Sequence, residues 1–417
     1  MYKTIVYEPG LNIDFGFGEA KQQADLDKLL NIIDLILIQN NCSKSVVWNM
    51  YQIDRLGHTM FEPEAIKAML GIDFNDLAII IPNNRQFCNE SMFRFAVMGA
   101  QLIFTDAEWL VRVMHSCRAV VERNDRKYVL LGGHIYEEYS DHLALGGAPG
   151  RYNLTQMDYL SGFEDDLLSR YHLNAQQKLV VLHNREGGWF NAVYHNHRNS
   201  NIQNFFPSIR YLISLGYIVV RIGDATMQKL PDIDGVIDLP FDPRKQEFDD
   251  LIFIKLSSFY IGSTSGPYDL PRFLGKPVLA HNVAELPGSI DDQFLLFKNY
   301  YHRKLKRTLS YLEIFTSRAG FVTQMEEFQS LDIFPIENGP NELLMSIAGM
   351  VRVAEFGLNE DDLDYIKHAN KLNKIIGSIS KDDDSKFADR IFSPQYLGRC
   401  IPTPAYKDID PGFVSIV

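Results

Sequence analysis

Short apolar runs alternate along the chain with segments whose apolar residues recur at helical spacing. The runs Leu179–Leu182 and Tyr217–Val220 are uninterrupted, which is typical of strands covered on both faces of a parallel sheet. Between them, Ile202–Leu215 has apolar residues three and four positions apart, and Gly216 follows as a helix-ending residue. This order predicts a strand–loop–helix–strand unit of an α/β protein.

The same alternation extends toward both ends of the chain. Further strands are predicted at residues 45–48, 77–81, 102–104, 128–131, 235–238, 259–262 and 277–280. Further helices are predicted at residues 20–41, 62–70, 93–97, 157–171, 249–256, 270–274, 341–357 and 360–377. Pro63 then falls in the first turn of its helix, where proline is tolerated.

The chain of 417 residues is too long for one hydrophobic core, so the pattern predicts two α/β domains. We place the N-terminal domain at residues 1–150, a linker at 151–177, the C-terminal domain at 178–345, and C-terminal helices and a tail at 346–417. No internal repeat of solenoid length is present in the sequence.

Composition narrows the class of protein. The net charge of −12 disfavours a nucleic-acid partner bound through a broad basic face. The four cysteines lie far apart without metal-ligand spacing, which indicates unpaired thiols in a reducing cytosol. No secretory leader or apolar run of membrane-spanning length stands near residue 1, so we expect a cytoplasmic protein.

One basic stretch leaves peripheral contact with the inner face of a membrane open. Residues 300–307 mix aromatic and basic side chains, a composition suited to an anionic lipid surface. Such a run is more often the solvated face of a helix, and that is the alternative interpretation.

Polar clusters follow the two apolar runs where the predicted strands end. His183 and Arg185 follow the first strand, Arg198 and Asn199 precede the helix, and Arg221 ends the second strand. Gly223 and Asp224 come directly afterwards. Ligands of open parallel sheets bind beyond the carboxyl ends of the strands, and converging guanidinium groups suit phosphate. A single arginine at such a position is more often solvated or in a structural ion pair.

A small-residue turn adds to this edge. Ser263, Thr264, Ser265 and Gly266 stand between a predicted strand and a helix, where backbone N–H groups and hydroxyls can receive a diphosphate. The turn lacks the P-loop pattern, and an ordinary helix cap is the alternative. Three further residues at or past strand ends are candidates for binding the base or ribose of a nucleotide. These are Asp238, Asn282 and Glu285.

The N-terminal half offers one comparable loop. Arg55 and His58 follow the predicted strand at 45–48, and Glu62 lies one helical turn after His58. A histidine here can act as a base or bind an acceptor, whereas a hydrogen-bonded structural histidine is the commoner case.

Several of these residues, taken in order, resemble a family of bacterial glycosyltransferases linked to surface-polysaccharide synthesis. The motifs are Arg55-Leu56-Gly57-His58, His183-x-Arg185, Arg198-Asn199, Arg221-x-Gly223-Asp224, Gly262-x-Thr264-Ser265-Gly266 and Arg390-Ile391-Phe392-Ser393-Pro394. The His-x-Arg and Arg-x-Gly-Asp loops are also similar to those of GT-B-type fucosyltransferases. The resemblance implies two Rossmann-like domains facing a cleft, with the nucleotide sugar on the C-terminal one. Where the family pattern leads us to expect an aspartate, this chain has Glu186.

Together these features predict a glycosyltransferase that moves a sugar from a nucleotide-activated donor to a glycan or lipid-linked acceptor. Arg185, Arg221 and the serine-rich turn would stabilise the departing phosphate without a metal or any cofactor besides the nucleotide sugar as co-substrate. Glu186 and His58 are the candidate catalytic bases. The alternatives are a nucleotide-sugar epimerase or hydrolase on the same fold, and a non-catalytic module that binds a glycan or nucleotide.

Overall fold

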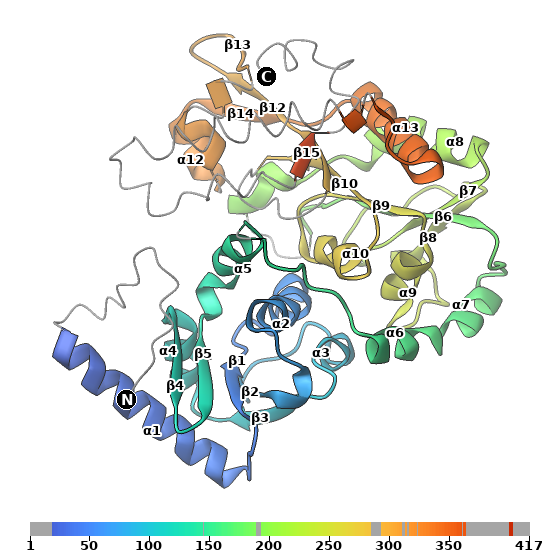
Figure 1. Cartoon of the computed structure of the whole chain (residues 1–417). Coiled ribbons are helices and arrows are strands. Elements are labelled where there is room, and N and C mark those ends of the chain that lie inside the picture. Colours follow the sequence, from blue (N-terminus) through green and yellow to red (C-terminus); the bar gives the residue numbers. More distant parts are fainter. Residues whose placement is uncertain are drawn as a thin grey trace. The chain divides into compact units, whose positions relative to one another are not determined.

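The computed structural model describes residues 19–144, 146–188, 193–284, 293–310, 313–314, 317–322, 324–360, 362–363 and 400–402. The chain divides into two compact units, Met1–His142 with Gly147–Gly150, and Leu143–Gly146 with Arg151–Val417 (Figure 1). Each unit is built on a largely or wholly parallel sheet accompanied by helices, which confirms the predicted α/β class. The motif at Arg390–Pro394 lies outside the described residues.

The first unit has a five-stranded sheet in the order β3-β2-β1-β5-β4. Its strands are β1 (Val46–Asn49), β2 (Leu77–Pro82), β3 (Gln101–Thr105), β4 (Ala119–Arg123) and β5 (Arg126–Leu130). Neighbouring strands are parallel except β4, which pairs antiparallel with β5. Strands β2 and β3 lie on one side of β1 and β5 on the other, so the winding direction changes between β1 and β5.

The helices of this unit are α1 (Glu19–Gln39), α2 (Leu56–Leu70), α3 (Glu90–Ala96), α4 (Glu108–Ser116) and α5 (Ile135–Ala144). One core cluster joins apolar side chains of α1, α4 and the sheet, among them Ile33, Leu110 and Ile80. The uninterrupted apolar strands are therefore buried as their pattern predicts.

Helix α2 begins six residues earlier than its sequence indicates. The prediction that it starts at Glu62 is wrong, and Pro63 lies inside the helix instead of in its first turn. Thr59, Met60 and Phe61 are fully buried, and the Thr59 hydroxyl donates to the Leu56 carbonyl at 2.9 Å. Burial of this turn thus outweighs the weak helix propensity of a segment that contains Gly57.

The second unit has a seven-stranded parallel sheet in the order β15-β11-β10-β9-β6-β7-β8. Its strands are β6 (Lys178–His183), β7 (Tyr217–Arg221), β8 (Val236–Asp238), β9 (Phe259–Gly262), β10 (Val278–Val283), β11 (Gln293–Phe297) and β15 (Cys400–Pro402). Strands β6, β7 and β8 run outward on one side, and β9, β10 and β11 on the other. This is the doubly wound order, whose switch point lies between β6 and β9.

Several helices accompany this sheet. They are α6 (Leu154–Ser161), α7 (Glu164–Arg170), α8 (Phe206–Ser214), α9 (Asp249–Leu256), α10 (Leu270–Phe273), α12 (Met325–Ser330) and α13 (Pro340–Phe356). The single helix predicted at 157–171 is two helices, because the first ends at Gly162. Arg170 of α7 forms a two-pronged ion pair with buried Asp249, at 2.7 and 2.8 Å, so the predicted linker region 151–177 carries helices held to this unit.

A small antiparallel sheet follows in the chain, formed by β12 (Asn299–His302), β13 (Arg307–Thr308) and β14 (Ile333–Ile336). The interpretation of residues 300–307 as a helix face is therefore wrong. Tyr300 is 2% exposed, and Arg303 lies 3.7 Å from the centre of the Phe334 ring. Lys304 pairs with Asp332 and Arg307 with Glu313, both at 2.5 Å. These partners compete with an anionic surface, and peripheral membrane contact stays a prediction.

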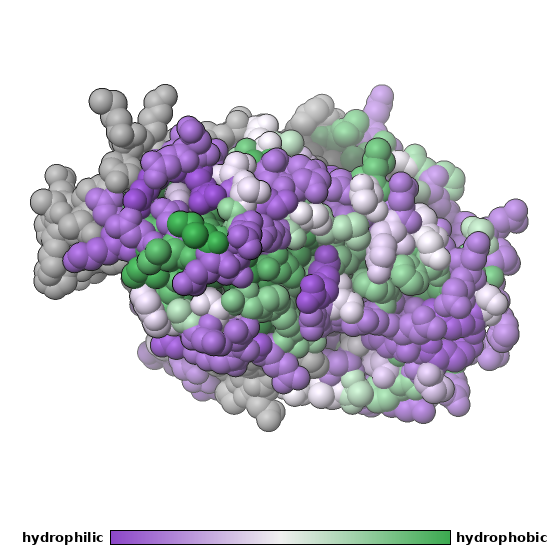
Figure 2. All heavy atoms as spheres, turned by 90° about the horizontal axis from the view of Figure 1, so that it is seen from below, coloured by the Kyte–Doolittle hydropathy of each residue, from purple (hydrophilic) through white to green (hydrophobic). Residues whose placement is uncertain are grey.

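The surface is mainly polar, with hydrophobic side chains gathered on part of the face seen in Figure 2. Among the large exposed apolar residues are Leu35 and Ile38 of α1, at 59% and 69% exposure, and Trp109 at 55%. Within the described part of the chain, no helix combines the length and apolarity needed to cross a bilayer.

Candidate functional site

The switch point of the second sheet brings together the two loops that the sequence singles out. Arg185 follows β6 and Ser263 follows β9, its neighbour in the sheet. The backbone N–H of Arg185 donates to the Ser263 hydroxyl at 3.0 Å. The His183 carbonyl accepts from the Ser263 N–H at 3.3 Å and pairs with His281 Nε2 at 3.0 Å. The edge where the doubly wound order places ligands therefore carries the predicted phosphate-binding residues.

Two histidines at this edge are buried and neutral. Burial lowers the pKa of His183 and of His281 to about 3, and nearby positive charge from Arg221 and Arg185 adds to the effect at His183. The Ser265 hydroxyl lies 3.2 Å from His183 Nδ1. These rings therefore act as hydrogen-bonding groups without adding positive charge at neutral pH.

Arg185 is half-buried, and its guanidinium contacts two oxygens of the loop that follows. Its guanidinium donates to the His195 carbonyl at 3.1 Å and to the side-chain oxygen of Asn199. Arg198 and Asn199 end and follow a short 3₁₀ helix, Val193–Arg198, so the second predicted polar cluster lies beside the first. By accepting this hydrogen bond, Asn199 helps to hold the Arg185 side chain in place.

Lys298, which directly follows β11, was not foreseen from the sequence. Its ammonium donates to the Asn199 backbone carbonyl at 2.7 Å, and its side chain is only 2% exposed. Burial lowers the pKa of Lys298 to about 8. The sequence does carry a signal for Lys298, because a basic residue stands at the end of an apolar strand there, as Arg221 does at the end of β7.

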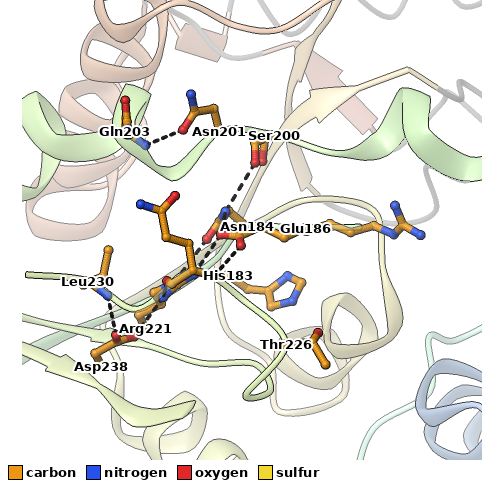
Figure 3. A network of polar contacts seen from close by, with 12 residues as sticks. His183, Asn184, Glu186, Ser200, Asn201, Gln203, Arg221, Thr226, Leu230 and Asp238 are labelled. Atoms are coloured by element: carbon orange, nitrogen blue, oxygen red, sulfur yellow. Dashed lines mark hydrogen bonds and ion pairs between the residues drawn. The ribbon is translucent and has the colours of Figure 1, made fainter. Parts of the chain in front are cut away.

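Arg221 is fully buried at the centre of a network of polar contacts (Figure 3). Its guanidinium pairs with Glu186 at 2.9 Å and Asp238 at 3.0 Å, and donates to the Gln228 carbonyl at 2.7 Å and to Asn184 Oδ1 at 3.3 Å. Its donors therefore have protein partners, and the role of Arg221 as a phosphate ligand stays a prediction.

Glu186 is engaged in the same network. Oε1 accepts from Arg221 and from Asn184 Nδ2, and Oε2 accepts from the Gln228 N–H at 2.6 Å. Both oxygens of Glu186 are therefore engaged by protein donors, one of them the Arg221 guanidinium. In this arrangement Glu186 holds Arg221, and its role as a catalytic base stays a prediction.

Three further predicted residues of this unit form hydrogen bonds within the protein. Asp238 Oδ2 accepts from the Leu230 N–H at 2.8 Å, and Asp224 accepts from the Thr226 N–H at 2.8 Å in the turn after Gly223. Asn282 is buried and exchanges two hydrogen bonds with Asn338, at 2.7 and 2.8 Å. These contacts hold loops of the second unit in place, and binding of a base or ribose by Asp238 and Asn282 stays a prediction.

The small-residue turn itself stays available. Thr264 is 6% exposed, and its hydroxyl has no hydrogen-bond partner among the described residues. Gly266 opens a short 3₁₀ helix that ends at Asp269. Glu285, predicted to contact the nucleotide, lies outside the described residues.

The switch point of the first sheet has its own polar cluster, between the carboxyl ends of β1 and β5. His58 Nδ1 lies 2.6 Å from Glu62 Oε1 on helix α2, which Arg55 precedes as the capping residue. Glu62 is 1% exposed, whereas the His58 side chain is 24% exposed. Burial raises the pKa of Glu62, and the hydrogen bond to His58 partly offsets this. A carboxylate on Nδ1 leaves Nε2 to exchange a proton with a ligand.

Further groups of this cluster were not foreseen from the sequence. His115, at the end of α4, lies 3.3 Å from the Gln52 side chain, and Arg85 stacks 3.8 Å above the Tyr51 ring. Burial lowers the pKa of His115 to about 4, with positive charge from His58, His134 and Arg85 adding to it. These residues are scattered through the sequence, and only the fold brings them near one sheet edge.

No group of three or more histidine, cysteine or acidic residues able to hold a metal occurs among the residues that the structure describes.

No protein-family model matches the sequence, and comparison with curated proteins gave no match. Solved structures give weak likenesses. A glycosyl transferase family 9 protein from Veillonella parvula is 12% identical, with 69% of this chain and 96% of that chain covered and a TM-score of 0.38. The E. coli ADP-heptose lps heptosyltransferase II is 11% identical, with 57% and 84% covered and a TM-score of 0.36.

A third likeness is to the dodecameric iron-containing heptosyltransferase TibC in complex with ADP-D-beta-D-heptose. It is 14% identical, with 76% of this chain and 79% of that chain covered and a TM-score of 0.35. All three TM-scores lie below 0.5, too low for the likeness to establish a fold or function for this chain. The fucosyltransferase-like character of the motifs stays a prediction.

Proposed function

We propose that this chain is a glycosyltransferase that uses a nucleotide-activated sugar. The observation that carries the proposal is the meeting of Arg185 with the Ser263–Gly266 turn at the switch point between β6 and β9. The backbone N–H of Arg185 meets the turn, and the hydroxyls and amides of the turn, together with the Arg185 guanidinium, are donors of the kind that suit the diphosphate of such a donor.

The proposed reaction is direct displacement at the anomeric carbon. The bond from the sugar to the diphosphate breaks while the acceptor hydroxyl forms the new bond, and negative charge develops on the departing phosphate. Arg185 and the donors of the turn stabilise this charge, a contribution of the kind that oxyanion holes make. The neutral rings of His183 and His281 allow hydrogen bonding beside the cation without repelling it.

The first unit supplies the proton acceptor in this proposal. Glu62 orients the His58 ring through Nδ1, and Nε2 removes the proton of the acceptor hydroxyl. The acceptor is a glycan or a lipid-linked glycan, and the setting is synthesis of bacterial surface polysaccharide. Arg55 and His115 extend the set of groups that can contact the acceptor at this edge.

A product assay tests the proposal against its alternatives. The protein is incubated with a panel of nucleotide sugars, first alone and then with a panel of oligosaccharide and lipid-linked acceptors, and the products are identified by mass spectrometry. We expect a glycosylated acceptor and free nucleoside diphosphate only when both substrates are present. Full conversion of the donor without an acceptor would instead identify an epimerase or hydrolase. Tight binding without turnover across the panels would identify a binding module.

A further inference from the structure

The burial of Lys298 favours the binding of a negatively charged partner. Its side chain is 2% exposed, and removing an ammonium group from water is costly unless an opposite charge compensates. Within the described residues, no carboxylate forms an ion pair with it, and its one hydrogen bond is to the neutral carbonyl of Asn199 at 2.7 Å. An ammonium has three donors, so two of them are unused by these residues.

The same asparagine links Lys298 to Arg185. The backbone oxygen of Asn199 receives the ammonium, and its side-chain oxygen receives the guanidinium. Two cations from loops after different strands, β11 and β6, are thus placed next to each other. Like charges this close repel, and the pKa of Lys298 is lowered first by burial and further by Arg185.

Among the residues that the structure describes, the other ionisable groups that act on Lys298 form no ion pair with it. Glu337 exerts an opposing attraction, but its Oε2 accepts from the Asn201 N–H at 2.9 Å and lies 3.4 Å from Asn204 Nδ2. His281 is neutral, since its pKa is lowered to about 3. Asn199 is therefore contacted by two cationic side chains.

We propose that Lys298 is a second cation of the donor site, and that an anionic oxygen of the donor's diphosphate binds between its ammonium and the guanidinium of Arg185. The inference rests on the proposed function and adds a residue to its phosphate site. The two cations contribute differently. The guanidinium offers a planar fork, and the ammonium offers a compact charge whose donors can turn toward either phosphate.

This arrangement makes nucleotide binding sensitive to pH. Lys298 titrates near pH 8 in the free protein, and a bound diphosphate favours its charged form. Affinity should therefore fall as the pH rises through about 8. The phosphate groups of a nucleoside diphosphate finish ionising at about pH 6, so they do not titrate in this range. His281, whose pKa is lowered to about 3, also keeps one charge state there.

Calorimetric titration of the full chain with UDP, GDP, ADP and inorganic pyrophosphate at pH 7 tests the proposal. Lys298→Met keeps the length of the side chain without its charge, and Lys306→Met, at an exposed position, is the matched control. We expect Lys298→Met to weaken the preferred nucleoside diphosphate and pyrophosphate at least tenfold, and Lys306→Met to change neither. The unphosphorylated nucleoside should bind both variants and the wild type alike.

The possible outcomes distinguish the proposed role of Lys298 from the proposed function of the protein. A nucleoside diphosphate bound equally by wild type and a folded Lys298→Met variant overturns the role of Lys298 and leaves the proposed function standing. Pyrophosphate bound in a Lys298-dependent way without any nucleotide supports the anion site and overturns the proposed function. Binding of neither ligand overturns both.

The wild-type protein provides a second test that does not depend on the stability of a variant. Between pH 7 and 9.5 its affinity for the preferred nucleoside diphosphate should fall at least tenfold. A constant affinity over this range would overturn the proposal.

Discussion

The two sheet edges share a topology and differ in chemistry. In both units the first strand lies at the point where the winding direction changes, and polar loops follow it. The edge of the first unit gathers histidines beside carboxylates, represented by His58 on Glu62. The edge of the second gathers cations on neutral oxygens, represented by Arg185 and Lys298 on Asn199. Topology therefore places the sites, and the partners of each side chain decide what it can do.

The difference in partners has a direct chemical meaning. A buried carboxylate stabilises the positive charge that a histidine acquires when it takes a proton, so the His58–Glu62 pair suits proton transfer. Neutral carbonyl oxygens, such as the His195 carbonyl that Arg185 contacts, orient a cation without cancelling its charge. Arg221 shows the third case, in which two carboxylates pair with an arginine and oppose its charge.

The largest expected effect comes from removing the Arg221 guanidinium, which pairs with two carboxylates. Arg221→Met should lower the unfolding free energy by about 3–5 kcal/mol, because Glu186 and Asp238 would lose the charge that compensates their partial burial. Urea denaturation measures this, with Arg210→Met on the exposed face of α8 as control. A folded variant of unchanged stability that binds nucleotide weakly would support Arg221 as a phosphate ligand.

The next prediction sharpens the assignment of the base to the first unit. His58→Ala should reduce the transfer rate by about 10²–10⁴-fold, the usual contribution of a general base, and leave donor affinity unchanged. Glu62→Gln should reduce the rate less, since it weakens the orientation of the ring and keeps Nε2. Steady-state kinetics with a fixed acceptor measures both. Transfer by His58→Ala at the wild-type rate would make this loop structural.

The dependence of the unfolding free energy on acid pH should show whether His281, at the edge of the second sheet, is neutral in the folded protein. The folded pKa of His281 is about 3, below its ordinary value of 6.5, so the unfolded chain binds the extra proton first as the pH falls. The stability that neutral His281 contributes is present above about pH 6.5 and is lost as the pH falls toward 3. Over pH 4–6, His281→Gln should reduce the slope of unfolding free energy by about 1.4 kcal/mol per pH unit. An unchanged slope would contradict neutral burial.

The smallest expected effect is that of chelation. If Arg185 and Lys298 supply the positive charge for the departing diphosphate, EDTA should leave the transfer rate within about twofold of its untreated value. Rate measurements before and after dialysis against EDTA, followed by addition of Mg²⁺ or Mn²⁺, check this. Loss of activity that a metal restores would show that the arginine and lysine charges are insufficient.

Much of the second unit could be predicted from sequence because its strands are buried on both faces. The apolar runs of β6, β7 and β9 can be recognised as strands from the sequence, and polar residues end or follow each of them. Parallel strands bring such ends to one edge, which is why the sequence alone was enough to place Arg185 and Ser263 together.

The partners within the site could not be predicted in the same way. Acids and arginines stand together at the ends of β6, β7 and β8, and the sequence does not say which of them face each other. Arg221, Glu186 and Asp238 satisfy one another in the folded protein, whereas Arg185 meets carbonyl and amide oxygens. Lys298 and His115 were missed because their significance lies in contacts with residues far away in the chain.

Direct measurement of nucleotide binding by an Arg185 variant tests the central claim, that the edge between β6 and β9 binds the donor diphosphate. Arg185→Ala should weaken the preferred nucleoside diphosphate by about 1.5–3 kcal/mol, the scale of a charge-assisted hydrogen bond, while Arg210→Ala binds as the wild type does. Calorimetric titration of the three proteins, each shown to be folded by circular dichroism, gives the answer. Equal affinity in all three would contradict the account.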